Sequence, residues 1–147
     1  MNFREITSAD LPALFLVRID PVENRATLEG LKSFGISIES LTQRLATTHK
    51  GWLCEIDGVP IGFTIGNGST GELEVFAVLR AYEGKGIGSK LLALAQDWLW
   101  SRGCETLWLY TSPKPTRAFK LYSKFGWKDS GMRYPSGDMR LELRKSL

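Results

Sequence analysis

Residues 83–90 constrain the fold most, because they place closely spaced glycines between a strand-like segment, 72–78, and an amphipathic, helix-like segment, 89–100. At the start of a helix, free N–H groups and the helix dipole favour an anion, and glycine lets the backbone approach it closely. The loop residues are Glu83, Gly84, Lys85, Gly86, Ile87, Gly88, Ser89 and Lys90. Neither a GxGxxG fingerprint nor a Walker A motif can be written here. We expect a phosphate-binding turn, with a plain glycine-rich turn as the alternative.

The order of the other segments predicts an α+β fold around a mixed sheet. Helical segments are expected from Ser8 to residue 18, from Pro21, from Ser37 and from Pro115. Strands are expected at 2–7, 51–56, 60–65, 72–78, 106–110, 127–129 and 139–143, with an Asp57-Gly58 hairpin turn. The helix at 89–100 makes the strands at 72–78 and 106–110 parallel neighbours. With 147 residues and no internal repeat or linker, we expect one domain, 1–147.

Composition excludes several classes of protein. Hydrophobic residues make up 43% and charged residues 24%, as in a soluble globular chain. No apolar stretch approaches the roughly 20 residues of a membrane span, and the first ten residues lack the apolar core of a signal peptide, so we expect a cytoplasmic protein without membrane contact. Cys54 and Cys104 form no disulfide framework or CxxC pair. The single histidine, His49, lies in a polar stretch and is interpreted as a solvated loop residue; no metal site is expected.

Charge is unevenly distributed along the chain. Residues 1–73 carry 6 Lys/Arg and 9 Asp/Glu, a net charge of −3, whereas residues 74–147 carry 13 and 7, a net charge of +6. This asymmetry suits a site that holds an anion on one side and a cation on the other, although chance explains it equally well. The basic residues are scattered, which argues against nucleic-acid binding.

Two motifs resemble the GNAT superfamily of N-acetyltransferases over residues 60–130. The cofactor motif of that family, [Gln/Arg]-x-x-Gly-x-[Gly/Ala], is filled by residues 83–88, except that Glu83 replaces Gln or Arg; we expect its side chain to point away from phosphates. The next helix of the family, Asn-x-x-Ala-x-x-x-Tyr-x-x-x-Gly-[Phe/Tyr], is similar to residues 115–127. It matches at Ala118, Tyr122 and Gly126, keeps an aromatic at Trp127 and has Pro115 in place of Asn.

The resemblance implies a three-layer fold with a central, mostly antiparallel sheet, a splayed parallel strand pair and flanking helices. It implies acetyl-CoA as co-substrate, and transfer of its acetyl group to a primary amine of a small molecule by direct attack in a ternary complex. A peptide or protein acceptor (an N-terminus or a lysine) and a non-catalytic CoA-binding module are the alternatives. A monomer or homodimer is expected. The residues that the resemblance assigns to the cofactor are Phe76, Ala77, Val78, Gly84, Lys85, Gly86, Ile87, Gly88, Ser89, Lys90 and Phe119.

The same resemblance makes Tyr122 the candidate acid, because a phenol ordinarily keeps its proton at neutral pH and can give it to a thiolate. Glu72 and Glu74 are candidate bases: strand alternation puts both on one face together with Phe76, with Leu73 and Val75 on the other. Exposed carboxylates that only bind a cation are the alternative. Candidates to line the acceptor site are Arg25, Trp52, Trp108 and Tyr134.

Overall fold

The computed structural model describes residues 1–17, 37–114 and 116–145. The expected helical stretch from Pro21, with Arg25, and the helix-opening Pro115 lie outside the described residues. The strands are β1 (Asn2–Glu5), β2 (His49–Ile56), β3 (Val59–Asn67), β4 (Glu72–Val78), β5 (Thr106–Thr111), β6 (Lys128–Arg133) and β7 (Met139–Arg144). The α-helices are α1 (Leu11–Val17), α3 (Ile38–Thr47), α4 (Ile87–Ser101) and α5 (Arg117–Lys124), and the 3-10 helices are η1 (Ser8–Asp10) and η2 (Arg80–Tyr82).

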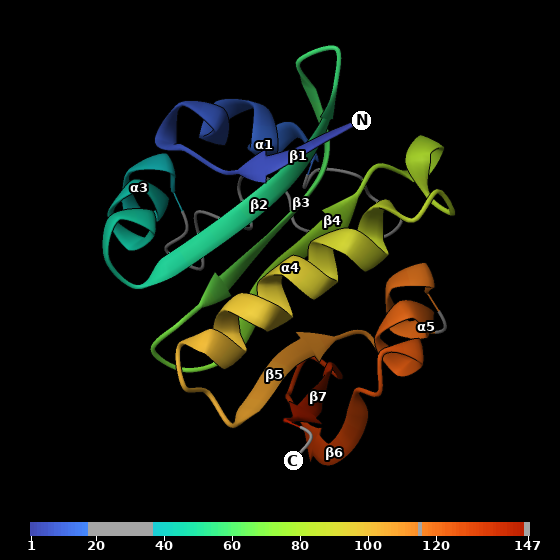
Figure 1. Cartoon of the computed structure of the whole chain (residues 1–147). Coiled ribbons are helices and arrows are strands. Elements are labelled where there is room, and N and C mark those ends of the chain that lie inside the picture. The colour runs from blue at the N-terminus through green and yellow to red at the C-terminus, as the bar shows by residue number, and fades with distance from the viewer. Residues whose placement is uncertain (18–36, 115, 146–147) are drawn as a thin grey trace.

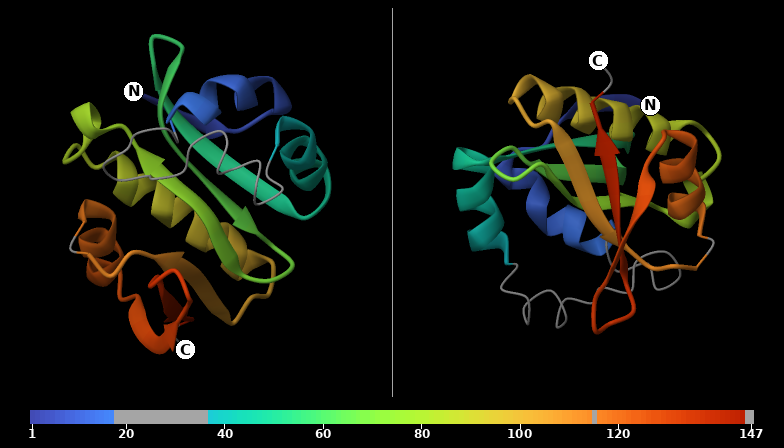
Figure 2. Two further views of the ribbon diagram at one scale, coloured as in Figure 1. Left: turned by 180° about the vertical axis from the view of Figure 1, so that it is seen from behind. Right: turned by 90° about the horizontal axis from the view of Figure 1, so that it is seen from below.

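Seven strands of the described residues form one sheet in the order β1-β2-β3-β4-β5-β7-β6. All neighbours are antiparallel except β4 and β5. Helices α4 and α5 cover one face of the sheet, and α1 and α3 cover the other, which gives three layers (Figure 2). This confirms the mixed α/β fold with one parallel strand pair. Among the described residues, no helix is long and apolar enough to cross a membrane.

The parallel strands β4 and β5 separate along their length. They are paired in register at Glu72 and Trp108 alone. From there the strands diverge towards their C-terminal ends, with α5 beside the opening (Figure 1). Gly71 marks the closed end, because a Cβ at this position would lie 2.8 Å from the carbonyl oxygen of Thr106. Within the described residues, the splay leaves one edge of β4 without a neighbouring strand over most of its length.

A β-bulge in β4 corrects one prediction. Ile65 pairs with Val75 but the next residue, Gly66, pairs with Leu73, so β4 contains one extra residue at Glu74. Leu73 packs in the core beneath α4, and Phe76 packs against that same core. Val75 and Ala77 pack in the core beneath α1 and α3. The two glutamates therefore do share a face, but Phe76 lies on the opposite one and Val75 does not lie with Leu73.

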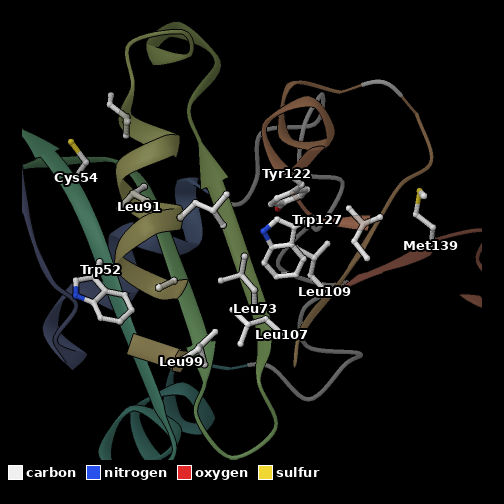
Figure 3. Packing of buried hydrophobic residues seen from close by; sticks show 14 of the residues in the cluster. Trp52, Cys54, Leu73, Leu91, Leu99, Leu107, Leu109, Tyr122, Trp127 and Met139 are labelled. Carbon is white, nitrogen blue, oxygen red and sulfur yellow. The ribbon is translucent and has the colours of Figure 1, made fainter. Parts of the chain in front are cut away.

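The larger core cluster lies between α4, α5 and the sheet (Figure 3). Leu91, Leu92 and Leu99 of α4 are fully buried in it, as the apolar repeat of that helix predicts. Trp52 also belongs to this cluster, and its ring centroid lies 6.0 Å from that of Trp98 in a T-shaped contact. Trp52 therefore lies on the opposite face of the sheet from Glu72 and Glu74 and does not line a site together with these two candidate bases.

Element boundaries differ from the prediction near polar residues. β1 ends at Glu5, and Ser8 opens a 3-10 helix rather than an α-helix. Asp10 pairs with Arg4 at 2.8 Å and receives the backbone N–H of Thr7, which ties this turn to the first strand. Strand β6 begins at Lys128 and extends to Arg133 rather than ending at residue 129.

Candidate active site

A cavity of about 290 Å³ opens between the C-terminal end of β4, the glycine loop and α5. Its volume suits part of a ligand of CoA size, with the remainder outside. Seven of the predicted cofactor residues line it: Phe76, Ala77, Val78, Gly84, Gly86, Gly88 and Ser89. The strand edge that the splay leaves open therefore faces the same space as the glycine loop.

The loop holds its glycines for different physical reasons. Gly86 has φ +81° and serves as the N-cap of α4, a conformation that an L side chain rarely adopts. The first backbone N–H groups of α4 therefore lie beside the cavity, and they have no hydrogen-bond partner inside the helix. A Cβ on Gly88 would lie 3.0 Å from Cδ2 of Leu121 and 3.1 Å from Cζ of Phe76, so glycine allows α4, α5 and β4 to meet. This arrangement can receive a phosphate group at the start of α4.

Positive charge reaches the cavity from α5, which the sequence reasoning missed. Arg117, Lys120 and Lys124 line it at a spacing of three and then four residues, which places them on one helix face. Four predicted cofactor residues are not among its lining. Lys90 lies over the ring of Phe3 at 4.8 Å, Lys85 lies near the ring of Tyr82 at 5.7 Å, Ile87 is buried and Phe119 packs against the core. The basic spacing that follows Thr116, the N-cap of α5, is the signal that identifies this row.

Glu83 lines the cavity rather than pointing away from it. Its Oε2 lies 2.9 Å from Nε of Arg117, and its side chain is only 12% exposed. The carboxylate that replaces the Gln or Arg of the motif is thus partly neutralised by a cation on α5.

Tyr122 is buried at 5% exposure, between the cavity wall and the core. Its ring centroid lies 5.6 Å from that of Phe76, which lines the cavity. The ring centroid of Trp127 lies 6.0 Å away, and Figure 3 shows these two residues side by side. Tyr122 itself does not line the cavity among the described residues. The candidate acid is thus one aromatic ring away from the cavity.

Glu72 and Glu74 have different surroundings although they share a face. Nδ2 of Asn67 donates a hydrogen bond of 3.2 Å to Glu74, and Nη1 of Arg44 lies 3.8 Å from it. No described side chain makes a hydrogen bond or ion pair with the carboxylate of Glu72. Burial, followed by the charge of Glu74, raises the pKa of Glu72 to about 7. Burial also raises the pKa of Glu74, but the contacts with His49, Asn67 and Arg44 outweigh it and lower that pKa overall.

His49 is not a solvated loop residue, as its polar neighbours suggested. It begins β2 and is 7% exposed, on the same face of the sheet as the two glutamates. Its Nε2 lies 2.9 Å from Oε1 of Glu74, which is within ion-pair distance, but the two atoms do not meet the geometry of a hydrogen bond. Thr48 Oγ1 lies 2.6 Å from its Nδ1.

Aromatic side chains continue this face onto β5 and the β6–β7 hairpin. The ring centroids of Trp108 and Tyr110 lie 5.2 Å apart, and those of Tyr110 and Tyr134 lie 4.1 Å apart. Arg140 lies over Trp108 at 4.4 Å and pairs with Glu142 at 3.0 Å. Trp108, the register partner of Glu72, and Tyr134 therefore belong to one row of rings that Tyr110 connects. No group of three or more metal-binding side chains occurs in the described parts of the chain.

The splayed parallel strand pair that opens beside a glycine loop at the start of a helix is the arrangement that the resemblance to the N-acetyltransferases implies. The family model described as the Acetyltransferase (GNAT) family matches residues 19–127. The chain therefore belongs to the acetyltransferase (GNAT) family, as the two motifs predict. Membership makes it an acyltransferase of the acetyl-CoA-dependent N-acetyltransferase type.

Solved structures share the fold at low sequence identity. The PaiA N-acetyltransferase of Thermoplasma acidophilum, in complex with coenzyme A, superimposes with a TM-score of 0.80 at 20% identity, covering 99% of this chain and 100% of that one. YncA of Salmonella typhimurium with its cofactor acetyl-CoA gives a TM-score of 0.79 at 17% identity, covering 100% and 95%. A ribosomal-protein-alanine N-acetyltransferase of Brucella melitensis gives 0.77 at 19% identity, covering 99% and 100%. No curated protein sequence matches the chain.

Proposed function

We propose that the chain transfers the acetyl group of acetyl-CoA to a primary amine of a small molecule by direct attack, with both substrates bound at once. Strand β4 carries the argument. Residues 76–78 at one end line the basic cavity, and Glu72 at the other end presents a half-buried carboxylate that makes no ion pair with the described residues. A thioester that extends along the open edge of β4 would approach an amine held at Glu72.

The donor is bound by backbone and by cations. The N–H groups at the start of α4 take phosphate oxygens, and Arg117, Lys120 and Lys124 neutralise their charge. The pantetheine arm lies in the gap between β4 and β5, where the open strand edge offers N–H and C=O groups to an extended ligand. The complexes of PaiA with coenzyme A and of YncA with acetyl-CoA support a donor in this fold.

Glu72 is the base in this proposal. A pKa of about 7 lets a carboxylate accept a proton at neutral pH and release it again, whereas the charge of Glu74 is already engaged with its neighbours. The amine loses its proton to Glu72, directly or through water. Its nitrogen then attacks the thioester carbonyl, so that the C–N bond forms and the C–S bond breaks.

Tyr122 is the acid in this proposal. The departing thiolate takes the phenolic proton, and the proton that the attacking nitrogen loses on becoming an amide restores the phenol, directly or through water. Glu72 then carries the one proton that is released to solvent. The contact between Tyr122 and Phe76 supports this role, because Phe76 is part of the wall along which the pantetheine arm extends.

The acceptor is recognised by one carboxylate and by aromatic rings. The other acidic side chains beside Glu72 are paired, Glu74 with His49 and Glu142 with Arg140, so that Glu72 remains to attract an ammonium group. The rings of Trp108, Tyr110 and Tyr134 can pack against the carbon chain of an amine and against its charge. These contacts favour a cationic amine over a neutral hydroxyl or an anion.

The decisive experiment measures CoA release from acetyl-CoA with amino acids, polyamines, aminoglycosides and peptides as acceptors. Thermal unfolding with acetyl-CoA is run in parallel, since binding at 1,000 times Kd stabilises a protein by about 4 kcal/mol. A shift together with turnover of small primary amines supports the proposal. Absence of a shift contradicts the donor site, and a shift with turnover of peptides alone contradicts the acceptor class.

A peptide N-terminus is the second candidate acceptor. The similarity of the fold to the ribosomal-protein-alanine N-acetyltransferase of Brucella melitensis favours it. The same panel separates the two candidates when it includes peptides that begin with alanine and amines of similar size without a peptide bond.

A further inference from the structure

His49 is the single histidine of the chain, and the proposed reaction makes no use of it. It is buried, with Thr48 at Nδ1 and Glu74 at Nε2. An ionisable pair buried at this depth costs desolvation energy and adds little stability compared with apolar residues. Its position beside the two glutamates therefore calls for an explanation other than packing.

Three elements converge on the carboxylate of Glu74. His49 contacts it from β2 at 2.9 Å, Asn67 donates from β3 at 3.2 Å, and Arg44 approaches from α3 at 3.8 Å. The side chain of Glu72, two residues away on the same face, has none of these contacts. Glu74 is the extra residue of the bulge in β4, and of the two carboxylates it alone makes these contacts with β2, β3 and α3 among the described residues.

We propose that His49 is a positioning residue that holds the negative charge of the glutamate pair on Glu74, and so leaves Glu72 as the group that exchanges a proton with the acceptor amine. This inference rests on the proposed function of Glu72. Of the two described side chains that can bring positive charge to Glu74, His49 is the nearer and the more buried, since Arg44 is more distant and more exposed.

The charges around the two glutamates fix the direction in which their pKa values change when His49 is removed. Two neighbouring carboxylates do not ionise equally, and the one with more favourable contacts loses its proton first. His49 lowers the pKa of both glutamates, so its removal must raise the proton affinity of the pair. The other groups that face Glu72 are Arg140 from β7 and Arg44 from α3, which lower its pKa, and Tyr110 from β5, which the charge of Glu72 affects in turn. Replacing His49 removes none of these three side chains, so the change in the pKa values reports on His49 itself.

The first test follows the carboxyl carbons of the glutamates by NMR as a function of pH, with E72Q and E74Q used to assign the two resonances. In the wild type, Glu74 should titrate at a lower pH than Glu72. In H49F, which keeps a planar ring but has no ring nitrogen, the midpoint of Glu74 should move up by about one pH unit or more. H49Q, which keeps an amide donor, should lie between them. An unchanged midpoint of Glu74 in both variants would overturn the proposal.

Lys50 supplies the matched control. It is the next residue of β2, but its Nζ pairs with Glu5 at 3.0 Å and makes no ion pair with Glu72 or Glu74. K50Q removes one positive charge from the same strand and should leave both glutamate midpoints in place. If H49F does not fold, H49Q and R44Q still test the proposal, because each removes one contact to Glu74 and should move its midpoint in the same direction.

A second readout uses whichever amine the acceptor panel identifies. Loss of His49 should move the acid limb of the kcat/KM profile to higher pH by about one unit and leave the KM for acetyl-CoA unchanged. A merely structural role would lower activity at every pH, and that result would contradict the proposal. The NMR titration requires no acetyl transfer, so it tests the contact between His49 and Glu74 even if the proposed reaction is wrong. Thermal shift with acetyl-CoA tests the donor site separately.

Discussion

At the C-terminal end of β4, the cavity is walled by backbone, small residues and one helix of basic side chains. At the N-terminal end of the same strand, Glu72 and Glu74 are surrounded by side chains from five other elements, α3, β2, β3, β5 and β7. The structure of the first end depends on the backbone conformations and close contacts that its glycines permit. The second depends on which side chains meet after the sheet has assembled.

Charge separates the two ends as well. Arg117, Lys120 and Lys124 belong to the basic half of the chain and line the donor end, whereas Glu72 and Glu74 lie where the acidic half passes into the basic one. In the proposed function, a single strand thus connects an end that binds an anion to an end that binds a cation. The predictions that follow test whether the two ends act independently, as their different construction suggests.

The largest expected effect is on the acid. Replacing Tyr122 with Phe should lower kcat roughly 10²–10⁴-fold, because the thiolate then leaves without a proton donor, and should leave the Kd of acetyl-CoA nearly unchanged. Steady-state kinetics and isothermal titration measure the two quantities. Tyr82, which also lines the cavity, provides the control: Y82F removes a phenol from the same site and should keep kcat. A wild-type kcat in Y122F would mean that another group protonates the thiolate.

The second effect concerns the donor end alone. Gly86→Asp should weaken CoA binding by about 10²-fold or more, because it adds a carboxylate where phosphate binds and forces a side chain into a left-handed backbone conformation. Gly103 has a similar φ of +89° with open space around its Cβ, but lies just beyond the other end of α4. Gly103→Asp therefore carries the same backbone strain and should bind CoA normally. Equal losses in both variants would show that strain, not phosphate binding, is responsible.

The C-terminal end of β4, with its cavity, was predictable because segments that are consecutive in the sequence form it. A strand, a glycine loop and an amphipathic helix lie consecutively, and each leaves a periodic or compositional signal over several residues. Asp57-Gly58 and the apolar face of α4 likewise predict the hairpin and the core. The basic row of α5 is equally local, and its spacing of three and then four residues is a sequence signal of the same kind.

The acceptor end was less predictable because its geometry depends on single residues. The bulge at Glu74 adds one residue to a strand whose composition is otherwise ordinary, and it reverses the predicted faces of Phe76 and Val75. His49 looked exposed because its sequence neighbours are polar, whereas its burial comes from β3 and α3, which pack around it only in the folded chain. The residue type of Trp52 suits an acceptor site, but its sequence does not say which face of the sheet it occupies.

The third effect separates the two glutamates by stability. Because the fold raises the pKa of Glu72 to about 7, ionising it costs stability that is absent at pH 4 and is fully felt above pH 7. Glu72→Gln should therefore stabilise the protein at pH 8 but not at pH 4. Since the side chain is only half-buried and solvent screens part of the interaction, we expect about 1–2 kcal/mol.

Glu74→Gln is the control, with the opposite sign. The fold lowers the pKa of Glu74, so its charge stabilises the protein above its ordinary pKa, and this stability is lost as the pH falls. The substitution should destabilise the protein at pH 8, because His49 and Arg44 lose their partner. Denaturant unfolding at pH 4 and pH 8 measures both variants. Changes of equal sign at pH 8 would contradict the different roles assigned to the two residues.

The smallest effect concerns the carboxylate at the donor end, where two influences of Glu83 oppose each other. Its ion pair with Arg117 orients a cation towards the cavity, but its negative charge repels phosphate. Because the side chain of Arg117 is 64% exposed, the pair orders it weakly and repulsion should prevail. Glu83→Gln should therefore tighten CoA binding about two- to three-fold at low salt, whereas Arg117→Gln should weaken it about five-fold. Both effects should shrink as the salt concentration rises, which isothermal titration at two ionic strengths measures. Weaker binding by Glu83→Gln would instead mean that Glu83 serves the donor site by holding Arg117 in place.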